Sequence, residues 1–232
     1  MFNIIKIEET TTVMDYIKQF TTNTVVIADK QTQGRGKGNR TWISQKSNNL
    51  YIAISIDSSN KNINYFNYCF ISAIAMIESL KELIDIDANL KIKWPNDILL
   101  NNKKICGILL ENDLQKHFLI IGIGVNIDSS PVLDDKILFP PTNIKQEGFT
   151  INKDELIDMF LKKFKEFNIN NCDLIKNKLI KYFYNFGKKI IIRNNNEEIS
   201  GIFKNIDNNG SLILDCNGIE KRFFSGDVFN IK

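Results

Sequence analysis

The segment from Gln31 to Trp42, QTQGRGKGNRTW, places the strongest constraint on how this 232-residue chain can fold. It contains three glycines and three cations within seven residues, and Trp42 is its one apolar side chain. Such a segment predicts a loop, and the apolar runs Thr24–Asp29 and Leu50–Ile56 predict the strands that it joins. Glycine lets a backbone approach a ligand closely, and arginine binds carboxylates and phosphates. We interpret the loop as an anion clamp, and composition alone leaves a solvated surface loop as the alternative.

Composition limits the class of protein. With 43% hydrophobic and 25% charged residues, and no apolar run of membrane-spanning length, the chain is typical of a globular protein. No secretory signal is apparent, and a net charge of +3 is too small to indicate nucleic-acid binding. The single histidine, His117, lies in an apolar run and is expected to be a strand residue, which disfavours histidine-based catalysis. Four scattered cysteines predict reduced thiols and a cytoplasmic location: Cys69, Cys106, Cys172 and Cys216.

The rest of the chain mixes short apolar runs with three longer helical patterns. Helices are predicted at 64–84, 152–167 and 174–186, and further strands at 90–94, 105–111 and 117–125, with a hairpin turn at 99–105. After Gly187 the pattern changes to short strands separated by turns, which is typical of a small barrel. The sequence therefore predicts an α+β fold with one domain over 1–186 and a second over 187–232.

Two other segments carry side chains suited to ligand binding. KIKWPND, residues 91–97, contains a lysine, a tryptophan, an amide and a carboxylate around a proline. GIGVN, residues 122–126, places glycines at the end of a predicted strand, where they leave room for a ligand against the backbone. Both tryptophans of the chain, Trp42 and Trp94, lie in or beside these candidate segments. Taken singly, each segment is more typical of a turn.

Together, and in this order, the segments resemble the biotin–protein ligase family. The family's glycine- and arginine-rich loop is GRGKGNRTW, its lysine-tryptophan motif is KWPND, and its following strand and turn are KICGILLE and GIGVN. The C-terminal segment SGIFKNIDNNGSLIL…FFSGDV is similar to the family's SH3-like barrel. The resemblance implies a mixed-sheet catalytic domain of the biotin/lipoate ligase type followed by that barrel.

The resemblance also implies roles for individual residues. Catalysis is assigned to Lys93, Arg35 and Lys37. Biotin binding is assigned to Thr10, Thr11, Thr12, Gln31, Arg35, Gly36, Lys37, Lys93 and Gly124, and ATP binding to Arg40, Trp42, Lys93 and Asn126. Two positions depart from the family pattern, because Thr12 stands where Asn is usual and Lys37 where Arg is usual.

The implied activity is that of a biotin–[acetyl-CoA-carboxylase] ligase. Such an enzyme activates biotin with ATP as biotinyl-5′-AMP and transfers it to a lysine of a biotin carboxyl carrier protein or carboxylase subunit. A carboxylate is already ionised at pH 7, so activation requires cations and Mg²⁺ rather than a general base. The sequence identifies no metal ligands, and for Asp97 it leaves open either help in deprotonating the acceptor lysine or a turn role.

Several alternatives bear on this assignment. A lipoate–protein ligase would use the same adenylate chemistry, and the intact KWPND and GRG segments favour biotin. A gene repressor would need a DNA-binding domain before the catalytic domain, and the chain before Thr10 is too short to supply one, so no DNA partner is expected. No membrane partner is expected either, and the sequence leaves a homodimer open. Without ligand, we expect the Gln31–Trp42 loop to be mobile.

Overall fold

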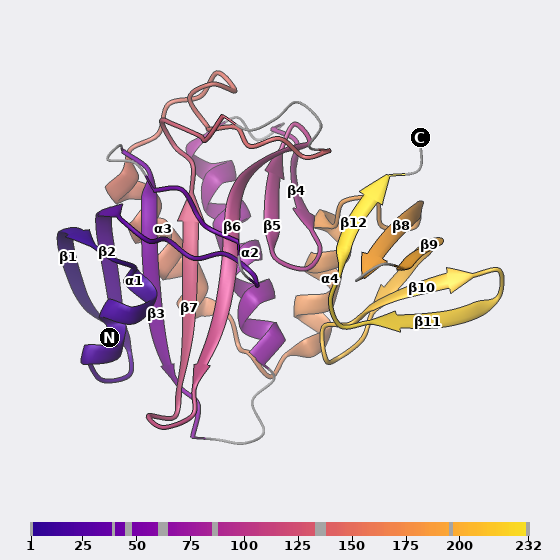
Figure 1. Ribbon diagram of the computed structural model, residues 1–232, viewed down its shortest axis with the longest axis horizontal. Helices are drawn as coiled ribbons and strands as arrows, with labels where there is room; N and C mark the ends of the chain where they lie inside the picture. The colour runs from indigo at the N-terminus through magenta and orange to yellow at the C-terminus, as the bar shows by residue number, and fades with distance from the viewer. Residues whose placement is uncertain are drawn as a thin grey trace.

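The structure is a computed structural model that describes residues 2–38, 40–44, 48–59, 65–84, 88–132, 138–194 and 197–230. Its larger part is built on a seven-stranded sheet (Figure 1). The strands are β1 (Asn3–Thr10), β2 (Thr24–Gln31), β3 (Leu50–Asp57), β4 (Leu90–Lys93), β5 (Asp97–Leu100), β6 (Lys103–Asp113) and β7 (Phe118–Val125). They lie in the order β1-β2-β3-β7-β6-β5-β4, in which only β1 and β2 pair in parallel. The predicted α+β fold with a mixed sheet is confirmed.

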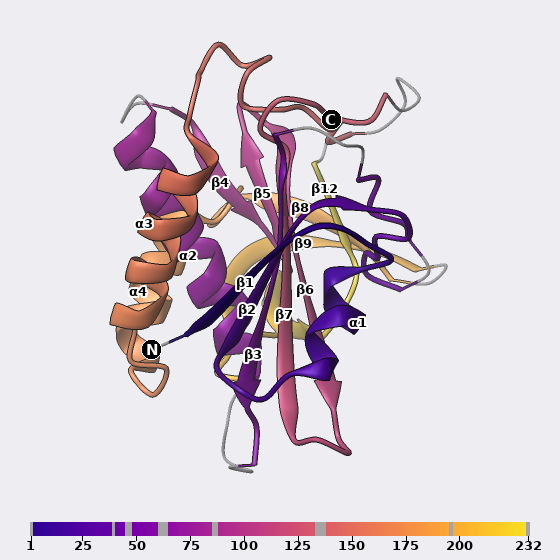
Figure 2. The same ribbon diagram turned by 90° about the vertical axis from the view of Figure 1, so that its left-hand side faces the viewer.

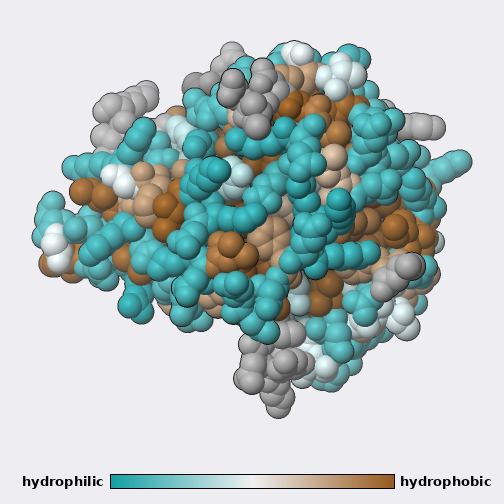
Figure 3. Space-filling model, turned by 180° about the vertical axis from the view of Figure 1, so that it is seen from behind, coloured by the Kyte–Doolittle hydropathy of each residue, from teal (hydrophilic) through white to brown (hydrophobic). Residues whose placement is uncertain are grey.

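Three helices cover one face of this sheet: α2 (Tyr65–Leu83), α3 (Lys153–Glu166) and α4 (Cys172–Tyr182) (Figure 2). Helix α2 is buried along most of its length because apolar residues lie on nearly all of its sides. Helix α3 begins after Asn152, whose side chain accepts hydrogen bonds from two backbone N–H groups of the first turn. Seen from behind (Figure 3), the outer surface of this helical layer is mostly hydrophilic. The main core therefore lies between the helices and the sheet.

The opposite face of the sheet carries much less protein. The short helix α1 (Val13–Tyr16), continued by a 3₁₀ turn, packs Val13, Met14 and Ile17 on β2, β3 and β7. Thr12 caps this helix, since its hydroxyl accepts a hydrogen bond from the Met14 N–H. The remainder of this face is left to the Gln31–Trp42 loop and to a cavity.

A second, five-stranded sheet follows the helices: β8 (Lys189–Asn194), β9 (Glu197–Ile206), β10 (Leu212–Cys216), β11 (Ile219–Phe223) and β12 (Asp227–Asn230). All its pairings are antiparallel, in the order β11-β10-β9-β8-β12. Its inner residues, such as Phe203 and Leu214, belong to the same buried cluster as the core of the first sheet. The Trp94 indole N–H also donates a 3.0 Å hydrogen bond to the Gly210 carbonyl. The two sheets therefore share one continuous hydrophobic core.

Several details differ from the expectations. Strand β1 was not predicted from the sequence. In the structure its side chains alternate between exposed and half-buried along part of its length. His117 lies in the exposed turn between β6 and β7, with a φ of +54°, so the expected strand position is wrong. Helix α4 ends at Tyr182, before the predicted limit, because the chain then pairs with Ile92. Asn64, the first residue of the predicted helix 64–84, lies outside the described residues.

Candidate active site

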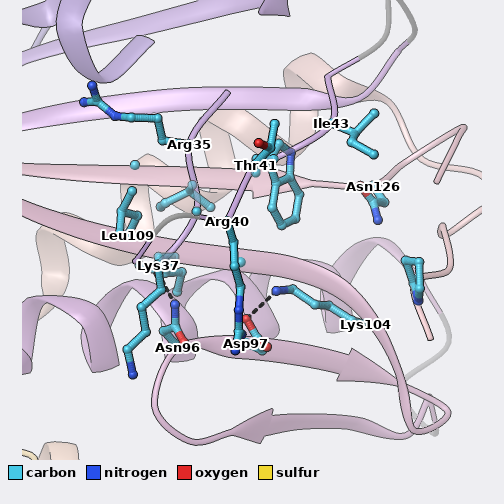
Figure 4. Close-up of a pocket in the computed structure, with 18 of the residues that line it drawn as sticks. Arg35, Lys37, Arg40, Thr41, Ile43, Asn96, Asp97, Lys104, Leu109 and Asn126 are labelled. Carbon is cyan, nitrogen blue, oxygen red and sulfur yellow. Dashed lines mark hydrogen bonds and ion pairs between the residues drawn. The ribbon is translucent and has the colours of Figure 1, made fainter. Parts of the chain in front are cut away.

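A cavity of about 470 Å³ lies on the α1 side of the first sheet, where the Gln31–Trp42 loop, the ends of several strands and β12 meet (Figure 4). Most of the sequence-predicted site residues line it: Thr12, Gln31, Arg35, Gly36, Lys37, Arg40, Trp42, Lys93, Gly124 and Asn126. Thr10 and Thr11 do not line it. Their backbone carbonyls instead accept hydrogen bonds from the N–H groups of Thr32 and Gln33, which fixes the start of the loop.

Arg35 does not present a free guanidinium to the cavity. Its two terminal nitrogens donate to the carboxylates of Asp15, at 2.7 and 3.1 Å, and Glu111, at 2.8 Å. In Figure 4 its side chain points away from the other labelled cations. Burial acts to raise the pKa of Asp15, but hydrogen bonds from Lys18 and Arg35 outweigh it and hold that pKa below its usual range. Arg35 therefore ties the loop to α1 and β6.

Lys37 and Arg40 lie further along the same loop. The Lys37 Nζ lies 6.0 Å from the centre of the Trp94 ring, and its pKa is lowered because neighbouring atoms displace part of its hydration. Arg40 is held by Asp227 of β12, with an Nη2 to Oδ2 distance of 2.6 Å. A backbone hydrogen bond from Gly36 N–H to the Arg40 carbonyl closes the turn between them. The loop thus brings two cations to the cavity: Lys37, which is exposed, and Arg40, which is paired with Asp227.

Lys93 is the most buried of the cavity cations, with 8% of its surface exposed. Its Nζ lies 3.9 Å from Asp97 Oδ2 and 5.1 Å from the centre of the Phe139 ring. Burial lowers the pKa of Lys93, and the nearby carboxylates of Asp97 and Asp227 offset part of this effect. A lysine in such a position needs anionic partners to keep its charge, and a bound carboxylate or phosphate would supply them.

The glycines of the predicted ligand turn accommodate side chains of the protein itself. A Cβ atom on Gly124 or Gly107 would come within 2.5 or 2.7 Å of the Trp42 ring, and one on Gly122 would come within 2.3 Å of Met14 Sδ. Gly107 and Gly124 are paired neighbours on β6 and β7, so the indole lies across both strands. The space expected for a ligand directly above these backbones is therefore taken by Trp42 and Met14.

Two amides fix the walls of the cavity. Gln31 is buried, with its Oε1 accepting from Val13 N–H at 2.9 Å and its Nε2 donating to Ser44 Oγ at 2.9 Å. Asn126 donates from Nδ2 to the Thr142 carbonyl at 3.0 Å. Both side chains line the cavity, and both use at least part of their hydrogen-bonding capacity to hold the backbone.

Sequence reasoning missed several residues that complete the site. Lys104 on β6 pairs with Asp97 at 2.7 Å, Asp227 holds Arg40, and Phe139 lies beside Lys93. The segments KICGILLE and FFSGDV contain Lys104 and Asp227, but nothing in their local pattern indicates that these two side chains reach the same cavity. Within the described ranges, no group of three or more His, Cys, Asp or Glu side chains comes together as a metal site.

Comparison with known proteins identifies the family to which this fold and cavity belong. Residues 3–128 match the biotin/lipoate A/B protein ligase family, and residues 186–229 match the biotin protein ligase C-terminal domain. The chain belongs to the biotin/lipoate A/B protein ligase family. It is 30% identical to a biotin–[acetyl-CoA-carboxylase] ligase of Paracoccus denitrificans, over 82% of this chain and 82% of that protein.

Two further similarities bear on the extent of the match. The bifunctional ligase/repressor BirA of Bacillus subtilis is 30% identical over 88% of this chain, and the match spans 65% of that relative's length. The biotin protein ligase of Aquifex aeolicus, solved in complex with biotin and ATP, has the same fold, with a TM-score of 0.81 and 98% of both chains covered at 22% identity. Among the described helices, none is both long and apolar enough to cross a membrane.

Proposed function

We propose that the protein is a biotin–protein ligase that activates biotin with ATP and transfers it to a lysine of a biotin carboxyl carrier protein or carboxylase subunit. The observation that carries the proposal is the convergence of Lys37, Arg40, Lys93 and Lys104 on one cavity of about 470 Å³. Such a set of cations suits a reaction that brings a carboxylate and a triphosphate together. The Paracoccus relative, named as a biotin–[acetyl-CoA-carboxylase] ligase, supports the same activity.

The first step joins two anions. An oxygen of the biotin carboxylate attacks the α-phosphorus of ATP, and the bond to the bridging oxygen breaks to release pyrophosphate. Biotinyl-5′-AMP remains bound. The barrier is mainly electrostatic, so Lys93, which is buried and has no hydrogen-bond partner among the described residues, is placed to stabilise the developing charge. In the second step the acceptor amine attacks the anhydride carbonyl and AMP leaves.

The assigned binding residues would take different roles in this proposal. Thr12, Gln31 and Gly36 would shape the biotin end, and Gly124 would act by leaving room for the Trp42 ring. Thr10 and Thr11 would act through the backbone of the loop. Arg40, Trp42 and Asn126 would face the nucleotide. Arg35 would keep the loop in place rather than bind phosphate directly, because its terminal nitrogens already contact carboxylates.

Other parts of the assignment stay predictions. Mg²⁺ commonly binds through one or two carboxylates together with substrate phosphates, and Asp97 and Asp227 are the carboxylates that line the cavity. Mg²⁺ bound there would neutralise phosphate charge. The division at 1–186 and 187–232, the cytoplasmic location and the absence of action on DNA are also retained as proposals.

Biotin-dependent exchange of labelled pyrophosphate into ATP tests the function. We expect the purified protein to catalyse exchange with biotin and to show little exchange with lipoate at the same concentration. Exchange with lipoate but not biotin would favour the lipoate–protein ligase alternative and overturn the proposal. Exchange with neither would contradict both assignments. Transfer to a carrier protein is then measured as a mass increase on its acceptor lysine.

A further inference from the structure

Asn49 is a buried asparagine that lies just before strand β3 and beside the end of β7. It has 3% of its surface exposed, and its neighbour Leu50 pairs with Val125, the last residue of β7. The chain leaves the sheet at the next residue, Asn126, which lines the cavity. Asn49 does not itself line the cavity. Its side chain is therefore placed to act, from outside the cavity, on the bend at 127–129 that follows Asn126.

The Asn49 side chain holds this bend by hydrogen bonds to its backbone. The Oδ1 atom accepts from three consecutive N–H groups, those of Ile127, Asp128 and Ser129, at 2.8, 3.0 and 3.2 Å. The Nδ2 atom donates to the Ser129 carbonyl at 2.9 Å and to the Ser129 hydroxyl at 3.2 Å. Successive N–H groups that converge in this way form a concave site for an electronegative atom. Because Asn49 supplies that atom, the shape of the bend depends on one side chain.

The bend and Asn126 are paired with a second segment of the cavity wall. Asn126 donates from Nδ2 to the Thr142 carbonyl at 3.0 Å, and its own carbonyl accepts from Ile144 N–H at 3.1 Å. The Ile127 carbonyl accepts from Lys145 N–H at 3.0 Å. The stretch just before Thr142 includes residues that line the cavity. Displacement of the bend would therefore move two parts of the wall, Asn126 and the segment that leads into Thr142.

We propose that Asn49 is a positioning residue for the nucleotide end of the cavity. By fixing the bend at 127–129, it sets the positions of Asn126 and of the segment at Thr142, which form the wall that ATP would meet. This inference rests on the proposed function, because that function assigns Asn126 to the nucleotide. Two residues assigned to the biotin end, Thr12 and Gln31, are held by other hydrogen bonds, so their positions should not depend on Asn49.

The first test measures hydrogen exchange at single amides of the free, ¹⁵N-labelled protein by NMR. In Asn49→Ala the three amides of the bend should exchange at least about tenfold faster, because their shared acceptor is gone. Asn49→Asp keeps an acceptor oxygen and should retain most of the protection. The matched control is Asn67→Ala in the helical layer, a buried asparagine whose Nδ2 donates to the Ile169 carbonyl; it should leave these rates unchanged. Unchanged exchange at the bend in Asn49→Ala would overturn the inference.

The second test separates the two substrates in biotin-dependent pyrophosphate exchange. Asn49→Ala should raise the KM for ATP by about tenfold and change the KM for biotin by less than about twofold. Asn49→Asp should recover most of the lost ATP affinity, and Asn67→Ala should leave both KM values at their wild-type levels. If Asn49→Ala does not fold, Asn49→Ser, which keeps a shorter hydrogen-bonding group, gives the same comparison.

The outcomes of this second test distinguish the inference from the function on which it rests. An equal rise in both KM values, or no rise in either, would contradict a positioning role at the nucleotide end. If the wild-type protein shows no exchange with biotin, the proposed function fails, while calorimetric titration with ATP still decides whether Asn49 supports nucleotide binding.

Discussion

A lysine with 8% of its surface exposed is uncommon, because burial disfavours the charged form. Lys93 is placed there by the end of β4, between the buried Ile92 and Trp94. Among the described residues its ammonium has two carboxylates nearby and a hydrogen bond to neither. The three N–H donors of Lys93 are therefore available to an incoming anion, whereas the terminal nitrogens of Arg35 already donate to carboxylates.

Lys93→Ala should therefore lower the rate of biotinyl-5′-AMP formation by roughly 10²-fold or more, the range for loss of one preorganised electrostatic stabiliser. Single-turnover measurements with biotin and ATP would show it. Lys91→Ala, on the same strand, is the matched control, because Lys91 points to the Lys181 carbonyl outside the cavity. A normal rate in Lys93→Ala would exclude the assigned role.

Lys37→Arg should slow the release of biotinyl-5′-AMP. Lys37 lines the cavity and is exposed, and a planar guanidinium can bond two phosphate oxygens where an ammonium acts as a point charge. The expected gain is about 1 kcal/mol, which is roughly a fivefold slower dissociation. Lys30→Arg, whose lysine pairs with Glu9 away from the cavity, should have no effect. Equal dissociation rates for wild type and Lys37→Arg would show that position 37 does not contact the intermediate.

At the scale of elements, local patterns predicted most of what the structure contains. The helix 152–167 and the hairpin at 99–105 follow from capping, apolar spacing and turn residues, all of which act over a few positions. What local patterns do not reveal is which distant charges meet. The sequence predicted a mobile loop that contains three cations. Two of those cations are neutralised by Glu111 and Asp227, 76 and 187 residues away in the chain.

The ion pairs of Arg35 predict the order in which trypsin should cut the Gln31–Trp42 loop in a limited digestion. Cleavage after Lys37 should be faster than cleavage after Arg35 in the free protein, because trypsin must first withdraw Arg35 from its two carboxylates. Biotin with ATP should slow cleavage after Lys37. Asp15→Asn, which removes one anchor, should speed cleavage after Arg35 alone. Mass spectrometry of the first fragments gives the order, and faster cleavage after Arg35 would contradict the anchoring.

At the scale of the whole molecule, one continuous core joins the two sheets, so the two sheets should unfold together. We expect far-UV circular dichroism and tryptophan fluorescence to report the same single transition in urea. Two separated transitions would show that the sheets unfold independently.

The two tryptophans test the junction directly. Trp94→Phe removes the buried donor to the Gly210 carbonyl and should reduce the free energy of unfolding by about 2 kcal/mol, within the range for an unpaired buried polar group. Trp42→Phe is the matched control, because the Trp42 indole N–H has no partner among the described residues. It should reduce the free energy less. Equal losses in the two variants would argue against a structural role for the Trp94 hydrogen bond.

The position of Asp227 in the chain has a consequence for synthesis of the protein. Asp227, Val228 and Phe229 form part of the cavity wall, yet they follow the last residue of α4 by more than forty positions. At about 5–20 residues per second, a ribosome takes several seconds to cover that interval. Throughout it, the first sheet and its helices are already made while one wall of the cavity does not yet exist. A nascent chain therefore gains a complete binding site only when β12 has emerged and paired with β8.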